Sequence, residues 1–303
     1  MTASSFFARM PLMRTRLSLD QFVKSHGLGN DYIVLDGSRL SRPLTPEAVR
    51  RICDIHYGIG SDGILLLTPG VEADFGVRIF NPDGGEAEKS GNGLRILAKF
   101  LYDHGYTDKS EFTVSTPGGP VRARLHLQAG RVAAITMDMG RATFVSSEIP
   151  VAGPRREVVR EPLEVEGRRL PVTCVSVGNP HCVIFTDVLD EEEVRRLGPA
   201  IEHHASFPNR INVQFAKVLA RDRVSILIWE RGAGYTLASG TSSCAVAAAG
   251  VKSGLTDRRV TIISPGGELA ISVAETWDLT LTGPASEIAR GTLSQDLLQG
   301  LPA

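Results

Sequence analysis

Two short segments of the chain pair a serine with a glycine immediately before an apolar stretch. Ser90-Gly91-Asn92 precedes one stretch and Ser239-Gly240-Thr241 precedes the other. If each segment begins a helix, its first turn carries unpaired backbone N–H groups and the positive end of the helix dipole, which together bind anions. A glycine at this point lets the backbone come close to a ligand. The two segments are therefore predicted to bind one carboxylate, with a serine on each side of it.

The two segments belong to an internal repeat. Residues 79–98 align without gaps on residues 228–247, an offset of 149 positions. Identical residues fall in a predicted strand, in a glycine-containing loop and in the helix: Ile79/Ile228, Gly85/Gly234, Ser90/Ser239, Gly91/Gly240 and Ala98/Ala247. Ser-Gly before a helix is also an ordinary helix cap, but its duplication favours a shared site. Serines on opposite faces of an α-carbon suit a reaction that removes a proton from one face and returns one to the other.

The elements that would position these serines follow from the hydrophobic pattern. The helix expected from about residue 91 to 104 is apolar nearly all round, and the helix expected from residue 240 carries no charge before Lys252. Both helices are therefore predicted to be buried. Short apolar strands and glycine-rich turns precede each of them. The pattern predicts an α/β protein built from two similar halves.

The overall composition is that of an ordinary globular protein. The 303 residues exceed the usual size of one domain, and the net charge of -1 gives no basic footprint for nucleic acid. No apolar run approaches the roughly 18 residues of a membrane-spanning helix. The four cysteines form no C-x-x-C pair, which favours a reduced, cytoplasmic compartment with neither disulfides nor a zinc site. We therefore expect a small-molecule ligand and no nucleic-acid or membrane partner.

The first eighteen residues form a separate segment. Residues 1–18 contain three arginines and no acidic residue. This composition faintly resembles a transit peptide, but a disordered extension or an upstream start codon is the favoured interpretation because Met10 and Met13 follow. We expect an N-terminal domain at 19–143 and a C-terminal domain at 144–303, whose end strands could pack back on the first domain.

Several ordered blocks resemble the diaminopimelate epimerase family, from about Phe22 to the end of the chain. The blocks are H-G-L-G-N-D at 26–31, H-Y-G-I-G-S-D-G at 56–63, N-P-D-G-G-E-A-E at 81–88, G-N-G-L-R at 91–95, M-G at 139–140, V-G-N-P-H-C at 177–182, F-P-N-R-I-N-V at 207–213 and E-R-G-A-G at 230–234. The resemblance implies two pseudo-symmetric domains, each a mostly antiparallel sheet wrapped around a central buried helix. It also implies isomerisation of an amino acid without pyridoxal phosphate, metal or any other cofactor, and a tendency to form homodimers.

The same resemblance implies roles for matching residues. Five of them would hold the reacting carboxylate or line its pocket: Asn30, Gly91, Asn92, Gly240 and Thr241. Five others match positions that bind the distal ammonium and carboxylate of diaminopimelate: Asn81, Asn179, Asn212, Glu230 and Arg231. The asparagines alone could be turn residues, whereas an arginine suits a carboxylate because it can donate two hydrogen bonds to it. His181 and Glu230 resemble a supporting pair beside the reacting centre.

The two catalytic positions of the family differ in this chain. The family usually has M-C-G-N-G and A-C-G-T-G, whereas this chain has K-S-G-N-G at 89–93 and A-S-G-T-S at 238–242. Tyr235 stands where a glutamate usually follows the second glycine loop. A thiol with an ordinary pKa of about 8.5 is readily ionised at a helix start, but a hydroxyl needs an adjacent base. Lys89 beside Ser90 is the one neighbouring candidate at a fixed spacing.

Three interpretations of the missing cysteines are open. An engineered exchange of both would normally leave Lys89, Tyr235 and Ser242 in family form, so it is disfavoured. A divergent isomerase, tautomerase or racemase could act on another amino or carboxylic acid with Lys89, His181 or Tyr235 as acid or base. A non-catalytic relative could bind a zwitterion without turnover. The first choice is an isomerase that resembles diaminopimelate epimerase and acts on diaminopimelate (LL to meso) or a similar amino acid, in or near lysine and cell-wall biosynthesis, with Ser90 and Ser239 as catalytic residues.

Overall fold

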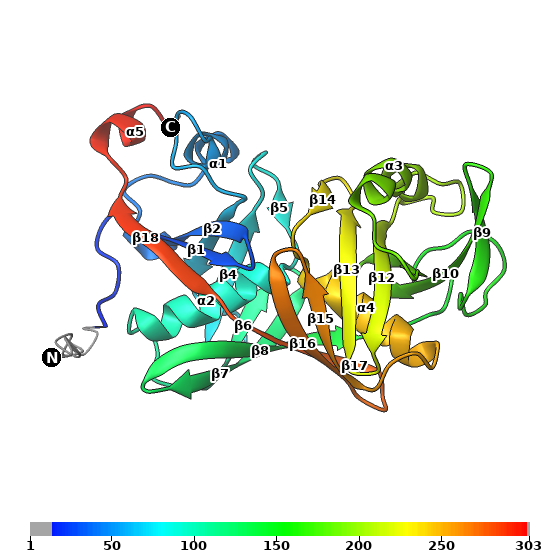
Figure 1. Ribbon diagram of the computed structural model, residues 1–303. Coiled ribbons are helices and arrows are strands. Elements are labelled where there is room, and N and C mark those ends of the chain that lie inside the picture. The colour runs from blue at the N-terminus through cyan, green and yellow to red at the C-terminus, as the bar shows by residue number, and fades with distance from the viewer. Residues whose placement is uncertain (1–13, 302–303) are drawn as a thin grey trace, which may run out of the picture.

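The computed structural model describes residues 14–301 and shows two lobes, each with one helix enclosed by strands (Figure 1). The elements of the first lobe that precede its central helix are β1 (Gln21–Gly27), β2 (Asn30–Asp36), a short 3-10 turn η1 (Gly37–Arg39), α1 (Pro46–Cys53), β3 (Ile64–Thr68), β4 (Phe75–Phe80) and β5 (Glu86–Ala87). The central helix and the strands that follow it are α2 (Gly91–Asp103), β6 (Glu111–Thr116), β7 (Gly119–Gln128) and β8 (Arg131–Arg141).

The second lobe repeats this arrangement with one extra strand at its start. The elements before its central helix are β9 (Glu161–Val165), β10 (Arg168–Ser176), β11 (Pro180–Phe185), α3 (Glu191–Glu202), β12 (Asn212–Ala220), β13 (Arg223–Glu230) and β14 (Gly234–Thr236). The central helix and the strands after it are α4 (Gly240–Lys252), β15 (Arg259–Ser264), β16 (Gly267–Val273) and β17 (Asp278–Gly283). The last two elements of the chain, β18 (Ser286–Thr292) and α5 (Gln295–Gln299), lie on the first lobe.

Strand pairings follow the same order in the two lobes. In the first lobe β1–β2 is antiparallel, β2–β3 parallel, β3–β4 antiparallel and β4–β6 parallel, and the β6–β7–β8 pairs are antiparallel. In the second lobe β10–β11 is antiparallel, β11–β12 parallel, β12–β13 antiparallel and β13–β15 parallel, and the β15–β16–β17 pairs are antiparallel. This duplicated topology confirms the predicted fold of two pseudo-symmetric halves, each a mostly antiparallel sheet around a buried helix.

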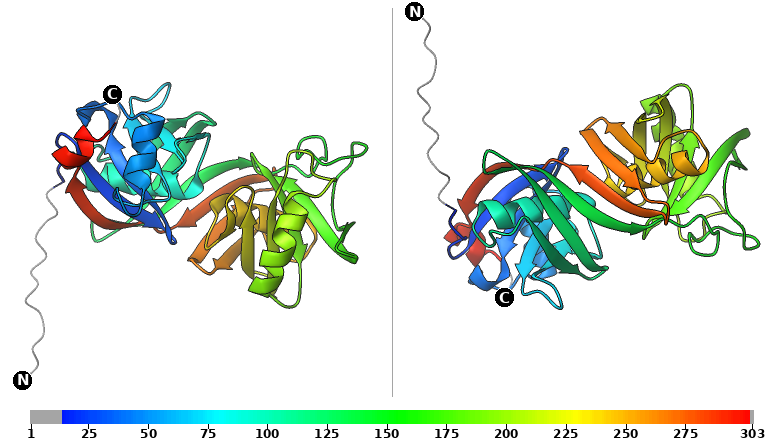
Figure 2. Two further views of the ribbon diagram at one scale, coloured as in Figure 1. Left: turned by 90° about the horizontal axis from the view of Figure 1, so that it is seen from above. Right: turned by 90° about the horizontal axis from the view of Figure 1, so that it is seen from below.

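Two strand pairs connect the lobes. β8 and β17 pair antiparallel, and Figure 2 shows both running from one lobe into the other. β18 then returns to the first lobe and pairs antiparallel with β1. Because the chain crosses between the lobes at β8 and again at β17, the mutual position of the two central helices is fixed by backbone hydrogen bonds.

The central helices are buried because their sequences are apolar nearly all round. In α2 the side chains of Leu94, Leu97 and Leu101 are 0% exposed, and in α4 every residue from Cys244 to Ala249 is 0% exposed. The small side chains of α4 allow strands to pack closely around it. Ser90 and Ser239 are the N-caps of these helices, so the core of each lobe places its serine at the junction of the lobes.

The N-terminal segment is described only in part. Residues 1–13 of the predicted extension lie outside the described residues. Within the rest, the guanidinium of Arg14 lies 3.7 Å from the centroid of the Tyr102 ring, and Leu17 is 5% exposed. Among residues 14–301, no helix has the length and apolar character needed to span a membrane.

Candidate active site

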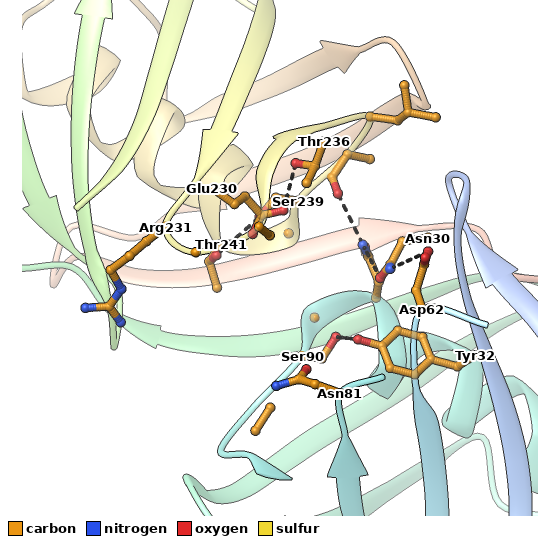
Figure 3. Close-up of a pocket in the computed structure, with 18 of the residues that line it drawn as sticks. Asn30, Tyr32, Asp62, Asn81, Ser90, Glu230, Arg231, Thr236, Ser239 and Thr241 are labelled. Atoms are coloured by element: carbon orange, nitrogen blue, oxygen red, sulfur yellow. Dashed lines mark hydrogen bonds between the residues drawn. The ribbon is translucent and has the colours of Figure 1, made fainter. Parts of the chain in front are cut away.

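A cavity of about 980 Å³ lies where the two lobes meet, and Figure 3 shows part of its lining. The first lobe contributes residues from β2, from the loop before β5 and from the start of α2, including Asn30, Asn81 and Ser90. The second lobe contributes residues from the end of β13, from β14 and from the start of α4, including Arg231 and Thr241. Both Ser-Gly segments predicted to share one ligand therefore face the same cavity.

The two helix starts touch each other at this cavity. A Cβ atom added to Gly91 would lie 3.5 Å from the Cα atom of Gly240, and one added to Gly240 would lie 3.4 Å from the Cα atom of Gly91. The Cβ atom added to Gly91 would also lie 3.2 Å from Met139 of β8, and the one added to Gly240 would lie 3.2 Å from Leu281 of β17. Glycine at both positions lets the free N–H groups of two helices face one small space, which suits a carboxylate.

Ser90 caps α2 and contacts a tyrosine of a neighbouring strand. Its Oγ accepts a hydrogen bond from the backbone N–H of Gly93 at 3.1 Å. The hydroxyl of Tyr32, on β2, lies 3.2 Å from the same Oγ. Burial raises the pKa of Tyr32 above its ordinary value of 10.0, while the contact with Ser90 lowers it in part. The phenol beside Ser90 is therefore protonated at neutral pH.

Ser239 caps α4 and contacts a carboxylate. Its hydroxyl donates to Oε2 of Glu230 at 3.2 Å, and the hydroxyl of Thr236 donates to Oε1 of Glu230 at 2.8 Å. Burial raises the pKa of Glu230 above its ordinary value of 4.5, while these two hydrogen bonds lower it. A carboxylate with a raised pKa is a stronger base than an ordinary one. The second serine thus has the adjacent base that a hydroxyl requires.

A buried arginine supports both helix starts. Arg95 is 0% exposed, and it donates to the backbone oxygen of Gly91 at 3.0 Å and to Oδ1 of Asn92 at 2.8 Å. Burial lowers the pKa of Arg95 to about 10, so the guanidinium stays charged at neutral pH. The Asn92 amide in turn donates to Oδ1 of Asn30 at 3.2 Å. A fixed positive charge beside two helix N-termini strengthens their attraction for an anion.

His181 and Asn212, both expected at the substrate, are buried away from the cavity lining. His181 is 0% exposed, and burial lowers its pKa to about 3. Its Nε2 lies 2.9 Å from Oδ1 of Asn179, which does line the cavity. Asn212 donates to the backbone oxygen of Pro180 at 2.8 Å and accepts from the backbone N–H of Arg231 at 2.9 Å. Both side chains therefore hold parts of the cavity wall and do not face a ligand.

Lys89, Tyr235 and Arg231 line the cavity but do not contact the serines. Burial lowers the pKa of Lys89, and in the described part of the chain it forms no hydrogen bond with Ser90. The Tyr235 hydroxyl donates to Glu191 of α3 at 3.1 Å, which turns it toward α3. The Arg231 side chain extends away from both serines in the view of Figure 3. Arg231 is therefore available to a ligand group remote from the serines, and Asn81 and Asn179 also line the cavity.

All four cysteines are free and buried. Cys53 is 4% exposed and Cys174, Cys182 and Cys244 are 0% exposed. Burial raises the pKa values of Cys53 and Cys244 to about 12. Because a thiol reacts as its thiolate, none of these groups replaces the family's catalytic thiols. Among residues 14–301, no group of three or more His, Cys, Asp or Glu side chains gathers as metal ligands would.

Several lining residues were not singled out from the sequence, among them Tyr32, Asp62 and Thr236. Tyr32 reaches Ser90 across a separation of 58 residues, and Asp62 accepts a hydrogen bond from the Asn30 amide at 3.0 Å. Both lie in or next to family-like blocks, at 26–31 and 56–63. Tyr32 directly follows the first block, and this position was the only signal available in the sequence for its role.

Comparison with known proteins agrees with this geometry. The family model described as diaminopimelate epimerase matches residues 22–145 and 173–288. Diaminopimelate epimerase 2 of a Nostoc species is 45% identical over 278 residues, which cover 91% of this chain and 96% of the relative. Diaminopimelate epimerase of Pelotomaculum thermopropionicum is 44% identical over 272 residues, which cover 89% of this chain and 97% of the relative.

Solved structures share the fold at low sequence identity. A hydroxyproline epimerase from Agrobacterium vitis, with bound trans-4-hydroxy-L-proline, gives a TM-score of 0.67 at 15% identity and covers 89% of this chain and 90% of its own. A phenazine biosynthesis protein of the PhzF family from Bacillus anthracis gives a TM-score of 0.65 at 15% identity and covers 92% and 100%. By its family match and the extent of its similarity to curated relatives, the chain belongs to the diaminopimelate epimerase family.

Proposed function

We propose that this protein is a cofactor-independent amino-acid isomerase that interconverts LL- and meso-diaminopimelate, using hydroxyl groups where its family usually uses thiols. Membership of the diaminopimelate epimerase family supports the reaction type. The observation that carries the proposal is the contact between the two helix starts at Gly91 and Gly240, with a capping serine on each. Such a site can hold one carboxylate while a different group faces each side of its α-carbon.

The binding half of the proposal rests on the charges and amides of the cavity. The reacting carboxylate would accept from the free N–H groups of α2 and α4, beside Asn92 and Thr241. At the other end, Asn81, Asn179 and Arg231 would take up the second carboxylate and ammonium. Asn212 would act through Arg231, because its Oδ1 accepts a hydrogen bond from the backbone N–H of Arg231 at 2.9 Å.

The chemical half rests on the carboxylate beside Ser239. As Ser239 Oγ takes the α-proton, its own proton passes to Glu230, so that no free alkoxide has to form. The electron pair left on the α-carbon is stabilised by the carboxylate, whose developing charge faces two helix N-termini and Arg95. Ser90 stands on the opposite face and returns a proton there. Lys89 and Tyr235 would shape the cavity without transferring the α-proton.

The proposed substrate would place the enzyme in lysine and cell-wall biosynthesis, in the cytoplasm. We also propose a homodimer, as the family resemblance implies. Sedimentation of the purified chain would give a mass near twice 32.6 kDa if this is correct, and a mass near the single value otherwise.

Exchange of the substrate α-proton for solvent deuterium tests the proposed function. The full chain is incubated with LL-diaminopimelate in D2O, and both configuration and α-deuterium are followed by NMR and chiral chromatography. We expect meso product that carries deuterium, and loss of both signals in a variant with Ser90→Ala and Ser239→Ala. Binding of diaminopimelate by calorimetry without any exchange would instead indicate a zwitterion-binding protein. Exchange on other amino acids but not on diaminopimelate would move the proposal to a different isomerase substrate.

A further inference from the structure

Tyr32 is held rigidly at the catalytic serine of the first lobe. Its side chain is 6% exposed, and its hydroxyl lies 3.2 Å from Ser90 Oγ (Figure 3). A Cβ atom added to Gly63 would lie 2.7 Å from Cε1 of the Tyr32 ring. The ring therefore occupies the space that a side chain at position 63 would need, and this close packing leaves the phenol one place to point.

Hydrogen-bond directions at the two serines differ. Ser239 must donate its proton to Glu230, because an ionised carboxylate only accepts. At Ser90 the Gly93 N–H already donates into Oγ. Either hydroxyl can donate in the contact between Tyr32 and Ser90; in the described part of the chain Ser90 is the only hydrogen-bond partner of the Tyr32 hydroxyl, so the arrangement that pairs the phenol proton has Tyr32 donating to the same Oγ. With two accepted bonds, Ser90 has its own proton free to point into the cavity.

The two serines therefore differ in what they present to a ligand: Ser239 presents a lone pair, and Ser90 presents a proton. Ser239 Oγ is approached as an acceptor by the Ser242 N–H and by the Thr241 hydroxyl, each at a long 3.4 Å. Thr241 can rotate its hydroxyl toward a bound carboxylate, which leaves a lone pair of Ser239 toward the α-carbon. Ser90 has the reverse arrangement, with its lone pairs occupied and its proton available.

We propose that Tyr32 acts through Ser90, as the acid that positions and replenishes the proton which Ser90 delivers to the face of the α-carbon opposite Ser239 and Glu230. This inference rests on the proposed function. In one direction the α-proton passes to Ser239 as the proton of Ser239 passes to Glu230. The electron pair on carbon then takes the proton of Ser90 as Ser90 takes the proton of Tyr32. The products are an inverted α-carbon, a protonated Glu230 and a tyrosinate.

Exchange of protons with solvent then restores the starting protonation states of Tyr32 and Glu230. Solvent returns a proton to the tyrosinate and removes one from Glu230 after product leaves, so no other reactant is consumed. Reaction in the opposite direction starts from the tyrosinate and the protonated carboxyl. Burial, which raises the pKa of Tyr32, still leaves the phenol a far stronger acid than a C–H bond next to a carboxylate, so it can protonate the carbanion.

Tyr32→Phe tests the proposal because it removes the hydroxyl and keeps the ring. LL- and meso-diaminopimelate are supplied separately in D2O to the full-length variant. We expect interconversion to fall at least about 100-fold, the scale of a lost general acid. One of the two isomers, the one whose α-hydrogen faces Ser239, should still gain α-deuterium with its configuration retained. The other isomer should show neither exchange nor inversion.

Tyr106→Phe is the matched control. Tyr106 is also a partly buried phenol, donates to Asp36 at 2.8 Å and does not line the cavity. It should leave the rate of interconversion within about threefold of the wild type, and the melting temperature of each variant reports its folding. Interconversion by Tyr32→Phe within threefold of the wild type would overturn the inference. So would equal loss of exchange from both isomers, which would make Tyr32 a group that only holds Ser90.

The inference and the proposed function fail in different ways. If the wild-type protein exchanges no α-proton of diaminopimelate, the proposed function is wrong and the role of Tyr32 falls with it. If the wild type interconverts the isomers and Tyr32→Phe does so equally well, the proposed function stands and only the role of Tyr32 is removed.

Discussion

The starts of α2 and α4 have the same backbone and different chemistry. Ser90 has φ −137° and ψ 117°, and Ser239 has φ −143° and ψ 127°; each caps its helix by accepting from the N–H three residues on. Yet the hydroxyl of Ser90 lies beside the phenol of Tyr32, whereas that of Ser239 lies beside the carboxylate of Glu230. The duplication has preserved the geometry of the capped helix start, while the group behind each serine has diverged.

This difference shows how a hydroxyl can work at a position that usually holds a thiol. A thiol is acidic enough to ionise at a helix start by itself, whereas a hydroxyl depends on its neighbour. A carboxylate neighbour makes one serine an acceptor of protons, and a phenol neighbour makes the other a donor. The four experiments below test this contrast, from the largest expected effect to the smallest.

Glu230→Gln should cause the largest loss, because it removes the carboxylate that accepts the proton of Ser239. We expect turnover in both directions to fall by about 1000-fold, within the range for a lost general base. Because burial raises the pKa of Glu230, its ionised form costs stability at neutral pH, so the variant should melt no lower than the wild type. Glu192→Gln, an exposed residue of α3, is the control. Turnover near wild-type level in Glu230→Gln would remove Glu230 from the reaction.

Ser239→Ala and Ser90→Ala should then show which serine acts on which face of the substrate α-carbon. Ser239→Ala should abolish interconversion and also α-proton exchange from the isomer whose α-hydrogen faces Ser239, because that face loses its contact with the α-carbon; exchange with retention can remain only in the other isomer, through Ser90 and Tyr32. Ser90→Ala should reduce interconversion by about 100-fold and leave exchange with retention in one isomer. Each change also removes a helix cap, at a cost of about 1 kcal/mol in stability. Identical exchange patterns in the two variants would contradict an asymmetric site.

The pH profile of turnover should show both neighbours. For the isomer whose α-hydrogen faces Ser239, Glu230 must be ionised, and burial raises its pKa, so turnover of this isomer should be lost as pH falls through a value above the ordinary 4.5. Tyr32 must be protonated, and burial raises its pKa, so activity should fall only as pH rises above 10.0. Tyr32→Phe should lose the alkaline limb and keep the acidic one. An acidic limb at or below pH 4.5 would show that Glu230 is not the titrating base.

Thiol reagents should leave the activity of the wild-type protein unchanged, which is the smallest of the four expected effects. Iodoacetamide reacts with thiolates, and the four cysteines are buried, with raised pKa values at Cys53 and Cys244. The wild type should keep its activity after treatment at pH 8. A variant with Ser90→Cys and Ser239→Cys should be inactivated by the same treatment, and prior diaminopimelate should protect it. Inactivation of the wild type would mean that a buried cysteine becomes accessible during turnover.

Local sequence patterns predicted the parts of the site that depend on neighbouring residues. Ser90-Gly91 and Ser239-Gly240 could be identified as helix starts because caps and apolar periodicity are encoded within one turn. The repeat at an offset of 149 positions predicted that two such starts exist. The contact between Gly91 and Gly240 confirms that they meet.

Side-chain contacts that depend on strand pairing could not be predicted from these local patterns. Tyr32 reaches Ser90 because β2 is a strand of the sheet that surrounds α2, and no local signal encodes its pairing. The parallel pairing of β11 with β12 puts His181 opposite Asn212, inside the wall and away from the ligand. Glu230 was predicted at the substrate, but its contact with Ser239 depends on the β13–β14 hairpin, which turns the chain back.

The wild-type protein in D2O provides the most direct test of two different proton carriers on opposite faces. The full chain is given LL- or meso-diaminopimelate, and α-deuterium is measured in product and in remaining substrate during the first few per cent of reaction. We predict that product formed from either isomer carries one solvent deuterium at the inverted carbon, while unreacted substrate keeps its proton. Product that retains the substrate's own α-proton would show one carrier serving both faces, and would contradict the assignment of Glu230 and Tyr32.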